Sequence, residues 1–270
     1  MRPLSEFSLQ EKHKIKFVLT DIDDTLTLKG RLPSLAYAAM EKLWHSGIKV
    51  IPITGRPAGW CDHMARMWPI NGIVGENGAF YFCYLQDKRK MVRRYWKSSQ
   101  QRQNDRIILK TIENRILKEF PGAKVSSDQT YREADLAIDY CEDVSPLPMF
   151  EVEKIVSLFK EMGAQAKVSS IHVNGWIGDY DKLSMTRILF QEVFHEVLDN
   201  IKEQALFVGD SPNDSPMFDY FPNSVGVSNV KDFLGHFTAE PIWITEKEGG
   251  LGFAELVEAL LGETTAGKWT

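Results

Sequence analysis

Short apolar runs rich in β-branched residues alternate with longer amphipathic stretches, both early in the chain and again near its end. The early runs cover residues 15–20, 48–53 and 73–74, and the stretches between them, residues 33–44 and 57–68, carry apolar side chains at helical spacing. Later in the chain we expect strands at residues 205–208, 224–227 and 241–244, each followed by a helical segment. Strands and helices in this alternation predict a parallel sheet with crossover helices, which is an α/β fold.

Between residues 84 and 180 the rhythm changes. In order, we expect a basic hairpin at residues 88–97, a helix at 100–120, a strand at 136–139, a helix at 148–162 and a strand at 167–171. Such a mixture predicts an α+β insert. We therefore expect one core of residues 15–83 and 181–270, interrupted by a cap domain of residues 84–180, with residues 1–14 as a flexible tail.

The composition is that of a globular protein, with 43% hydrophobic and 26% charged residues in a chain of 270. The net charge of -5 gives no general attraction to nucleic acid or to an anionic membrane, so the expected partner is a small molecule. Three widely spaced cysteines argue against a disulfide framework or a zinc site. Because no stretch has the length and apolarity of a membrane span or a secretory signal, we expect cytoplasmic localisation and no membrane insertion.

Acidic residues follow two of the predicted strands at the point where each strand ends. Asp21 and Asp23 come directly after the first apolar run, and alternation along an extended chain places their side chains on the same side. Asp210 and Asp214 follow the strand at residues 205–208 in a similar way. Open α/β sheets carry their reactive groups at the carboxyl ends of the strands, so we expect these carboxylates to converge. Four converging carboxylates repel one another unless a hard divalent cation lies among them, and Mg²⁺ fits that requirement.

A hydroxyl and an amine complete a set of groups suited to phosphoryl transfer. Thr54 ends the strand at residues 48–53 just before a helix, where its hydroxyl and free backbone N–H groups can hold phosphate oxygens. Lys182 stands at the start of a predicted helix, where its ammonium can neutralise charge on a phosphoryl group. Taken singly, each motif has an ordinary explanation, because acidic pairs cap turns, threonines cap helices and lysines are usually solvated. Their shared order and placement favour phosphoryl transfer through an aspartyl-phosphate.

The chain resembles the haloacid dehalogenase (HAD) superfamily through four motifs that occur in the same order, Asp21-x-Asp23-x-Thr25, Thr54, Lys182 and Gly209-Asp210-x-x-Asn213-Asp214. The insert follows Glu76-Asn77-Gly78-Ala79, which resembles the subfamily with a C2-type cap (subclass IIB), whose members include the Cof-like and sugar-phosphate phosphatases. The resemblance implies a Rossmann-like core sheet, an inserted α+β cap and a magnesium-dependent phosphatase activity.

The resemblance also implies a role for each matched residue. Asp21 is the nucleophile, and Asp23 protonates the leaving oxygen and then activates the water that hydrolyses the aspartyl-phosphate. By the same resemblance, Mg²⁺ is bound by the side chains of Asp21 and Asp210 and by the backbone carbonyl of Asp23. Asn213 and Asp214 support the metal site. Thr54 and Lys182 hold the phosphoryl group.

Features outside these motifs bear on the substrate. Asp24 replaces the glycine that is most common at its position, as in some sugar-phosphate phosphatases of the superfamily, which favours a sugar substrate. Candidate substrate contacts are Arg56, Asn77, Arg132, His172 and Asn174. Ser170, His172, Asn174 and Trp176 alternate with other residues and can line a sugar pocket, although a solvated strand face explains the alternation equally well. Residues 88–94 can bind an anionic group, with a solvated hairpin face as the simpler explanation.

Three hypotheses about function stay open at this point. The leading one is a cytosolic, magnesium-dependent phosphatase of a small phosphorylated metabolite, with a sugar phosphate as the favoured substrate. A phosphohexomutase would instead move the phosphoryl group within a hexose, and residues 88–94 would anchor the distal phosphate. A phospho-acceptor regulatory module would store the group on Asp21, but an acid/base residue at Asp23 promotes hydrolysis. The sequence names neither the substrate nor the oligomeric state.

Overall fold

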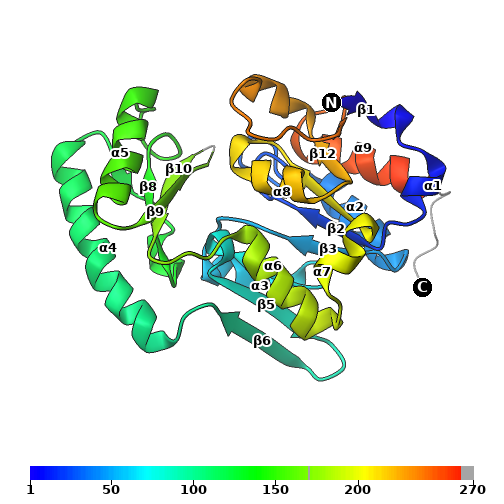
Figure 1. Cartoon of the computed structure of the whole chain (residues 1–270), viewed down its shortest axis with the longest axis horizontal. Helices are drawn as coiled ribbons and strands as arrows, with labels where there is room; N and C mark the ends of the chain where they lie inside the picture. The colour runs from blue at the N-terminus through cyan, green and yellow to red at the C-terminus, as the bar shows by residue number, and fades with distance from the viewer. Residues whose placement is uncertain (170, 263–270) are drawn as a thin grey trace. The chain divides into compact units, whose positions relative to one another are not determined.

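The computed structural model describes residues 1–169 and 171–262. The chain divides into two compact units, which are coloured by sequence in Figure 1. The sheet unit comprises Met1–Ile53, Pro69–Asn71 and the described residues from Phe190 onward. The insert unit comprises Thr54–Trp68 and Gly72–Leu189. Among residues 1–169 and 171–262, no helix combines the length and the apolarity that crossing a bilayer requires.

The sheet unit is built on a parallel sheet of six strands, which confirms the predicted α/β core. In spatial order the strands are β1 (Arg2–Pro3), β13 (Trp243–Ile244), β12 (Ser224–Gly226), β11 (Ala205–Gly209), β2 (Phe17–Thr20) and β3 (Lys49–Pro52). Every residue of β2 and β11 is buried, as expected for central strands whose two faces are both covered. The helices of this unit are α1 (Leu9–Lys12), α2 (Ser34–His45), α7 (Leu198–Ile201), α8 (Ser215–Tyr220) and α9 (Gly249–Leu261). Helices α2 and α9 pack side by side (Figure 1).

Residues 1–14 do not form the free tail that the sequence analysis expected. The strand β1 pairs with β13 at the edge of the sheet, and the side chains of Leu4 and Phe7 are buried. The ring of Phe7 stacks on Trp243 with the centroids 5.0 Å apart. Ser8 caps α1 through a capping box with Glu11. Two apolar side chains in a polar stretch are too few to give a periodic pattern, yet they suffice to dock the segment against an aromatic edge.

The insert unit contains two antiparallel sheets. One has the order β4 (Ile73–Gly75), β5 (Phe80–Leu85) and β6 (Lys90–Tyr95), and the other has the order β7 (Lys124–Val125), β8 (Asp135–Asp139), β10 (His172–Trp176) and β9 (Gln165–Val168). The helices are α3 (Ala58–Met67), α4 (Ser99–Glu119), α5 (Met149–Glu161) and α6 (Lys182–Leu189). Helices α4 and α5 pack on the second sheet and share a core with Leu136, Ile138 and Val173 (Figure 1).

The boundary between the units differs from the expected one at residues 84 and 180. Strand β5 continues the sheet that β4 begins, and helices α3 and α6 pack against both strands, so all four elements cluster with the insert. The basic stretch forms β6, the second strand of the β5–β6 hairpin. The strand expected at residues 167–171 includes Ser170, which lies outside the described residues; β9 ends at Val168, and β10 is a separate strand.

Candidate active site

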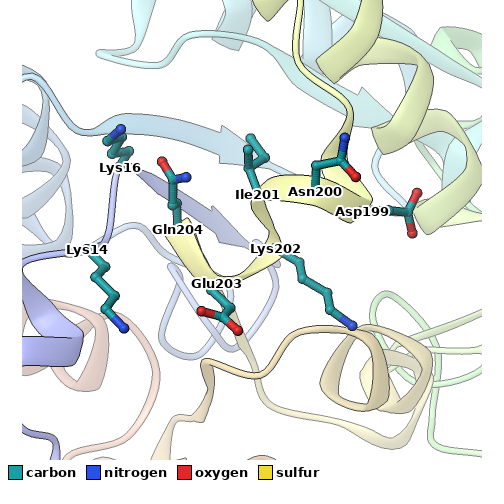
Figure 2. Close-up of a pocket in the computed structure, with 8 residues that line it drawn as sticks. All are labelled: Lys14, Lys16, Asp199, Asn200, Ile201, Lys202, Glu203 and Gln204. Carbon is teal, nitrogen blue, oxygen red and sulfur yellow. The ribbon is translucent and has the colours of Figure 1, made fainter.

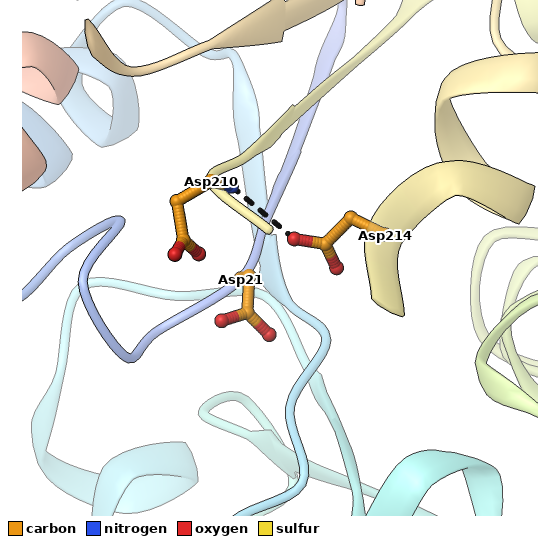
Figure 3. Close-up of side chains that lie close together, drawn as sticks. All are labelled: Asp21, Asp210 and Asp214. Carbon is orange, nitrogen blue, oxygen red and sulfur yellow. Dashed lines mark hydrogen bonds between the residues drawn. The ribbon is translucent and has the colours of Figure 1, made fainter. Parts of the chain in front are cut away.

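Three carboxylates gather at the carboxyl ends of two neighbouring strands of the sheet unit (Figure 3). Strands β2 and β11 pair in parallel with Thr20 opposite Val208, and the backbone N–H of Asp21 donates to the Val208 carbonyl at 2.9 Å. Asp21 and Asp210 therefore leave the sheet at the same edge. One carboxylate oxygen from each of Asp21, Asp210 and Asp214 lies within 4.8 Å of the others, and all three residues are buried.

Asp214 reaches this group from the 3₁₀ turn Pro212–Asp214, which follows β11. Its Oδ2 accepts a hydrogen bond from the backbone N–H of Asp210 at 3.3 Å, drawn as a dashed line in Figure 3. A Cβ atom at Gly209 would collide with the Asp214 carboxylate. The glycine in the fourth motif is thus required by the close approach of Asp214 to the strand end.

The loop after β2 folds into a tight turn that carries Asp23. The backbone N–H groups of Thr25, Leu26 and Thr27 all converge on the carbonyl of Ile22, at 3.3, 2.9 and 2.9 Å. The side chain of Asp23, which follows Ile22, is half-buried. This turn fixes the spacing between Asp21 and Asp23 without a helix or a strand.

Asp24 adopts a left-handed backbone conformation with φ of 54°. Glycine reaches this region most readily, and aspartate is among the few other residues that tolerate it, which accounts for both residue types at this position. The Asp24 carbonyl accepts a hydrogen bond from Asn229 Nδ2 at 3.0 Å, while Asn229 Oδ1 accepts one from the Gly249 N–H at 3.0 Å. Asn229 thereby ties the acidic loop to the start of α9, a role that no sequence motif indicated.

Mutual repulsion among the three carboxylates makes this group a candidate cation site. Burial raises the pKa of Asp210 well above its ordinary value, and the charges of Asp214 and Asp21 raise it further. The hydroxyl of Thr25 donates to Asp210 Oδ1 at 2.9 Å and opposes this shift. Mg²⁺ takes oxygen ligands at about 2.1 Å in an octahedron, so ligands on opposite sides of the ion are about 4 Å apart. The spacing and the all-oxygen chemistry of the group fit this ion.

We expect Asp210→Asn to have opposite effects on stability without and with Mg²⁺. In EDTA the neutral amide removes a buried like charge and keeps the acceptor for Thr25, so the variant should unfold at a higher temperature than the wild type. With Mg²⁺ at 100 times its dissociation constant, the wild type should gain about 2.7 kcal/mol, and the variant should gain far less.

Calorimetry or dye-monitored melting of both proteins, with and without Mg²⁺, checks this expectation. Asp219→Asn is the matched control, because Asp219 is exposed on α8 and should leave both melting temperatures unchanged. Equal stabilisation of wild type and Asp210→Asn by Mg²⁺ would contradict the assignment of Asp210 as a ligand.

Thr54 and Lys182 lie in the insert unit, where both pack around the turn Glu76–Gly78. Thr54 is buried, and its carbonyl accepts a hydrogen bond from the Asn77 N–H at 3.1 Å. Gly78 has φ of 108°, and a Cβ atom there would collide with the Asp181 carbonyl and lie 3.0 Å from the backbone nitrogen of Lys182. Lys182 is only 7% exposed, so it is not the solvated lysine of the ordinary explanation.

No protein-family model matches the chain, and no curated protein matches its sequence. A HAD/COF-like hydrolase from Plasmodium vivax matches with a TM-score of 0.67 and 16% identity, over 94% of this chain and 99% of that one. The sucrose-phosphatase from Synechocystis, solved with sucrose and phosphate, matches with a TM-score of 0.60 and 15% identity, over 90% and 97% of the two chains. A HAD subclass IIB sugar phosphatase matches with a TM-score of 0.57 and 13% identity, over 85% and 93%.

The chain has the fold of the HAD superfamily.

The similarity extends over nearly the whole of each chain, so it includes the insert as well as the six-stranded sheet. The resemblance drawn from the motifs is confirmed at the level of the fold. Sequence identities of 13%, 15% and 16% establish the fold but not the substrate.

A buried polar face on the second sheet of the insert unit carries two of the candidate substrate contacts, His172 and Asn174. Strand alternation directs Leu136, Ile138 and Val173 into the core beneath α4 and α5. The intervening residues of β8 and β10 form the opposite face, and its buried polar members are Asp135, Asp139, His172 and Asn174. Sequence reasoning found the alternation at 170–176 but left its exposure open; His172 and Asn174 are both buried.

Arg132 contacts this polar face through Asp135 and is bound by protein groups. Its Nε and Nη2 atoms donate to the two oxygens of Asp128 at 2.8 and 3.0 Å, and Nη1 lies 3.1 Å from the Asp135 carboxylate. Nη1 also donates to the Gly55 carbonyl at 3.0 Å. The side chain is 1% exposed. These contacts make Arg132 a buried cation that ties the turn to β8, and its role as a substrate contact stays a prediction.

Two of the remaining candidate contacts, Arg56 and His172, meet at Glu142, whereas Asn174 and Asn77 have other neighbours. Arg56 Nη2 lies 3.3 Å from Glu142 Oε1, and His172 Nε2 lies 2.9 Å from Glu142 Oε2. The close approach of His172 lowers the pKa of Glu142, and the charge of Arg56 lowers it further. Asn174 Nδ2 donates to Asp135 at 3.1 Å. The amide of Asn77 lies beside Gly55, where a Cβ atom would be 3.2 Å from its Nδ2.

In the sequence analysis Glu76 is named only as part of a motif, and no pattern predicted that its carboxylate joins distant segments of the chain. Its fully buried carboxylate accepts hydrogen bonds from the N–H groups of Ala58 at 2.9 Å, Glu133 at 2.8 Å, Ala134 at 2.6 Å and Asp135 at 3.2 Å. Burial raises the pKa of Glu76 to about 8, with a further contribution from the charge of Asp135. This one carboxylate fastens the start of α3 to the start of β8.

A cavity of about 360 Å³ opens elsewhere in the sheet unit (Figure 2). Lys16 precedes β2 and Gln204 precedes β11, so the cavity lies at the amino ends of these strands. Asp21, Asp210 and Asp214 lie at the carboxyl ends, which is the opposite edge of the sheet. In Figure 2 the amines of Lys14, Lys16 and Lys202 lie apart and do not converge on one point, which is unlike an anion-binding site.

Proposed function

We propose that this chain is a magnesium-dependent phosphatase that hydrolyses small phosphomonoesters, foremost sugar phosphates, through an aspartyl-phosphate on Asp21. The observation that carries the proposal is the group of Asp21, Asp210 and Asp214, whose oxygens lie within 4.8 Å of one another at the carboxyl ends of β2 and β11. The HAD fold supports it, and the sucrose-phosphatase solved with sucrose and phosphate supports a sugar phosphate as the substrate class.

In the proposed reaction a carboxylate oxygen of Asp21 attacks phosphorus, and the bond from phosphorus to the ester oxygen breaks. Asp23 gives its proton to the departing oxygen, so that a neutral alcohol leaves. Asp23 then takes a proton from water as the water oxygen attacks the phosphorus of the aspartyl-phosphate, which releases inorganic phosphate and restores Asp21.

The other residues of the proposed site bind and orient. Thr54 donates its hydroxyl to a phosphoryl oxygen, and Lys182 places its ammonium beside the same group. Asp21, the carbonyl of Asp23 and Asp210 would hold Mg²⁺, which would supply positive charge to offset that of the phosphoryl group. Asn213 and Asp214 would support this metal site. The proposed substrate contacts are Arg56, Asn77, Arg132, His172 and Asn174. A cytoplasmic setting, in which the three thiols stay reduced, goes with this proposal.

We expect purified protein to release inorganic phosphate from phosphomonoesters only with Mg²⁺. The panel should include hexose 6-phosphates, a disaccharide phosphate, phosphoserine and p-nitrophenyl phosphate, with released phosphate measured by molybdate. EDTA should abolish release, excess Mg²⁺ should restore it, and Ca²⁺ should restore it poorly, because Ca²⁺ prefers longer bonds and more ligands than this small group offers. Failure to release phosphate from every ester at saturating Mg²⁺ would refute the proposal.

The same purified protein distinguishes a phosphatase from the two alternative functions. A phosphohexomutase would convert a hexose 1-phosphate to the 6-phosphate without releasing phosphate. A phospho-acceptor module would form a phosphoenzyme that survives for minutes in magnesium buffer. We expect neither result, because the half-buried Asp23 lies two residues after Asp21 and suits activation of water.

A further inference from the structure

Two exposed aromatic side chains lie beside the polar face of the insert unit. Trp60, on the first turn of α3, is 39% exposed, and Tyr131, at the end of the 3₁₀ turn Gln129–Tyr131, is 56% exposed. Tyr131 lies against Gly59, the residue before Trp60: a Cβ atom at Gly59 would be 3.0 Å from Tyr131 Cβ and 3.1 Å from Cδ1. The absence of a side chain at Gly59 therefore lets Tyr131 lie directly against the helix that carries Trp60.

Neighbouring groups hold the indole of Trp60 and the backbone of Tyr131. The guanidinium of Arg56 lies over the indole of Trp60, 4.7 Å from its centroid, and Arg56 is itself held by Asp128 and Glu142. The N–H of Tyr131 donates to the Asp128 carbonyl at 2.9 Å. Preorganised aromatic rings lose little conformational entropy when a ligand stacks on them, so an exposed indole held in this way is suited to binding.

The chemistry around the rings is that of a carbohydrate site. The C–H faces of a pyranose ring pack on aromatic rings, and its hydroxyls need charged or polar partners nearby. The Glu142 carboxylate, whose side chain is 30% exposed, lies next to Arg56 and provides acceptors for such hydroxyls. Two aromatic side chains among charged groups make a patch far smaller than the roughly 800 Å² that each partner buries in a stable protein complex, so the patch suits a small ligand better than a protein.

The chain also limits how far the rings lie from the proposed phosphate-binding residue. Trp60 follows Thr54 by six residues, so their Cα atoms are within roughly 20 Å even for an extended segment. The Arg132 guanidinium further ties the turn that carries Tyr131 to the Gly55 carbonyl, next to Thr54. The aromatic pair and the proposed phosphate-binding hydroxyl thus belong to one connected part of the insert unit.

We infer that Trp60 and Tyr131 form a stacking platform for a hexopyranose ring of the substrate, with Glu142 accepting hydrogen bonds from its hydroxyls. The inference rests on the proposed function, because the sugar is the part of the substrate that carries the phosphate. It adds to that proposal the residues that select a sugar over other phosphomonoesters.

Direct sugar binding tests the platform without relying on phosphatase activity. Saturation-transfer NMR of the full chain with sucrose, trehalose and methyl α-glucoside should show transfer to the ring C–H protons. We expect Trp60→Ala and Tyr131→Ala to remove most of this transfer. Trp44→Ala is the matched control, because Trp44 is 38% exposed on α2 of the sheet unit and should leave sugar binding unchanged. Sugar binding that survives both substitutions, or its absence in the wild type, would overturn the platform.

Kinetics provide the second measurement. Each aromatic substitution should lower kcat/KM for a sugar phosphate about tenfold, as expected for a lost aromatic contact, and leave kcat/KM for acetyl phosphate unchanged. Equal losses on both substrates would overturn the platform while the proposed phosphatase function stands. Conversely, sugar transfer that depends on Trp60 and Tyr131 in a protein without phosphatase activity would support the platform and refute the proposed function.

Discussion

Asp21→Asn should abolish phosphate release, with kcat reduced on the order of 10⁴-fold or more, as is found when the nucleophile of a covalent mechanism is removed. An amide has the shape of the carboxylate, but its oxygen does not attack phosphorus at a useful rate. The backbone of Asp21 is fixed by its N–H bond to the Val208 carbonyl, so the substitution should leave the fold intact. Rapid-quench kinetics with intact-mass detection of the phosphoenzyme checks both the rate and the intermediate.

The metal and nucleophile roles of the acidic group can be separated in the same assay. Asp21→Asn should form no phosphoenzyme at any Mg²⁺ concentration, whereas Asp210→Asn should recover part of its activity as Mg²⁺ is raised. Asp219→Asn, with the same chemical change on an exposed face of α8, should retain wild-type turnover. Wild-type rates in Asp21→Asn would remove that residue from the nucleophile role.

The acidic group was predictable from sequence because local pattern determines its position. The apolar runs that become β2 and β11 are buried on both faces, and parallel pairing brings their carboxyl ends together. Residues that directly follow such strands, Asp21 and Asp210, must then meet at one edge. Asp214 is placed by a short turn, and its position depends on the glycine at 209.

The charged clusters of the insert unit were not predictable in the same way. Charged residues are rarely buried unless paired, and the pairing partner of each lies far along the chain or on another element. Glu76 illustrates the difficulty, because its four backbone donors come from residues 58 and 133–135, and no periodicity links these positions. Arg132 stands among polar residues that suit an exposed loop, and only the fold shows that Asp128 and Asp135 surround it.

Arg132→Met should lower the free energy of unfolding by about 3–5 kcal/mol, the usual cost of removing one partner of a buried ion pair. Methionine fills much of the same space, so the loss reports charge and hydrogen bonding more than packing. Burial alone would raise the pKa of Asp128, but the charge and hydrogen bonds of Arg132 hold it below its ordinary value. Burial raises the pKa of Asp135 even with Arg132 opposing it. Urea unfolding monitored by tryptophan fluorescence measures the difference.

The pH dependence of the stability lost in Arg132→Met distinguishes an effect of charge from an effect of packing. In the wild type, the stability that Asp128 contributes is present above its unfolded pKa and is lost as the pH falls through its lowered folded pKa. In Arg132→Met the same carboxylate and Asp135 should have raised pKa values, so the variant should recover stability as acid neutralises them. The difference between the two proteins should therefore narrow from neutral pH toward about pH 4.

Two further variants make the test specific to the buried cation. The double variant Arg132→Met with Asp135→Asn should regain part of the loss at neutral pH, because it removes a carboxylate that the single variant leaves buried and uncompensated. Arg115→Met is the matched control: Arg115 pairs with Glu119 and Glu161 on the exposed side of α4, and solvent screens both pairs, so no measurable loss is expected. A loss in Arg132→Met that is the same at every pH, and unchanged in the double variant, would assign Arg132 to packing and remove the ionic role argued for it.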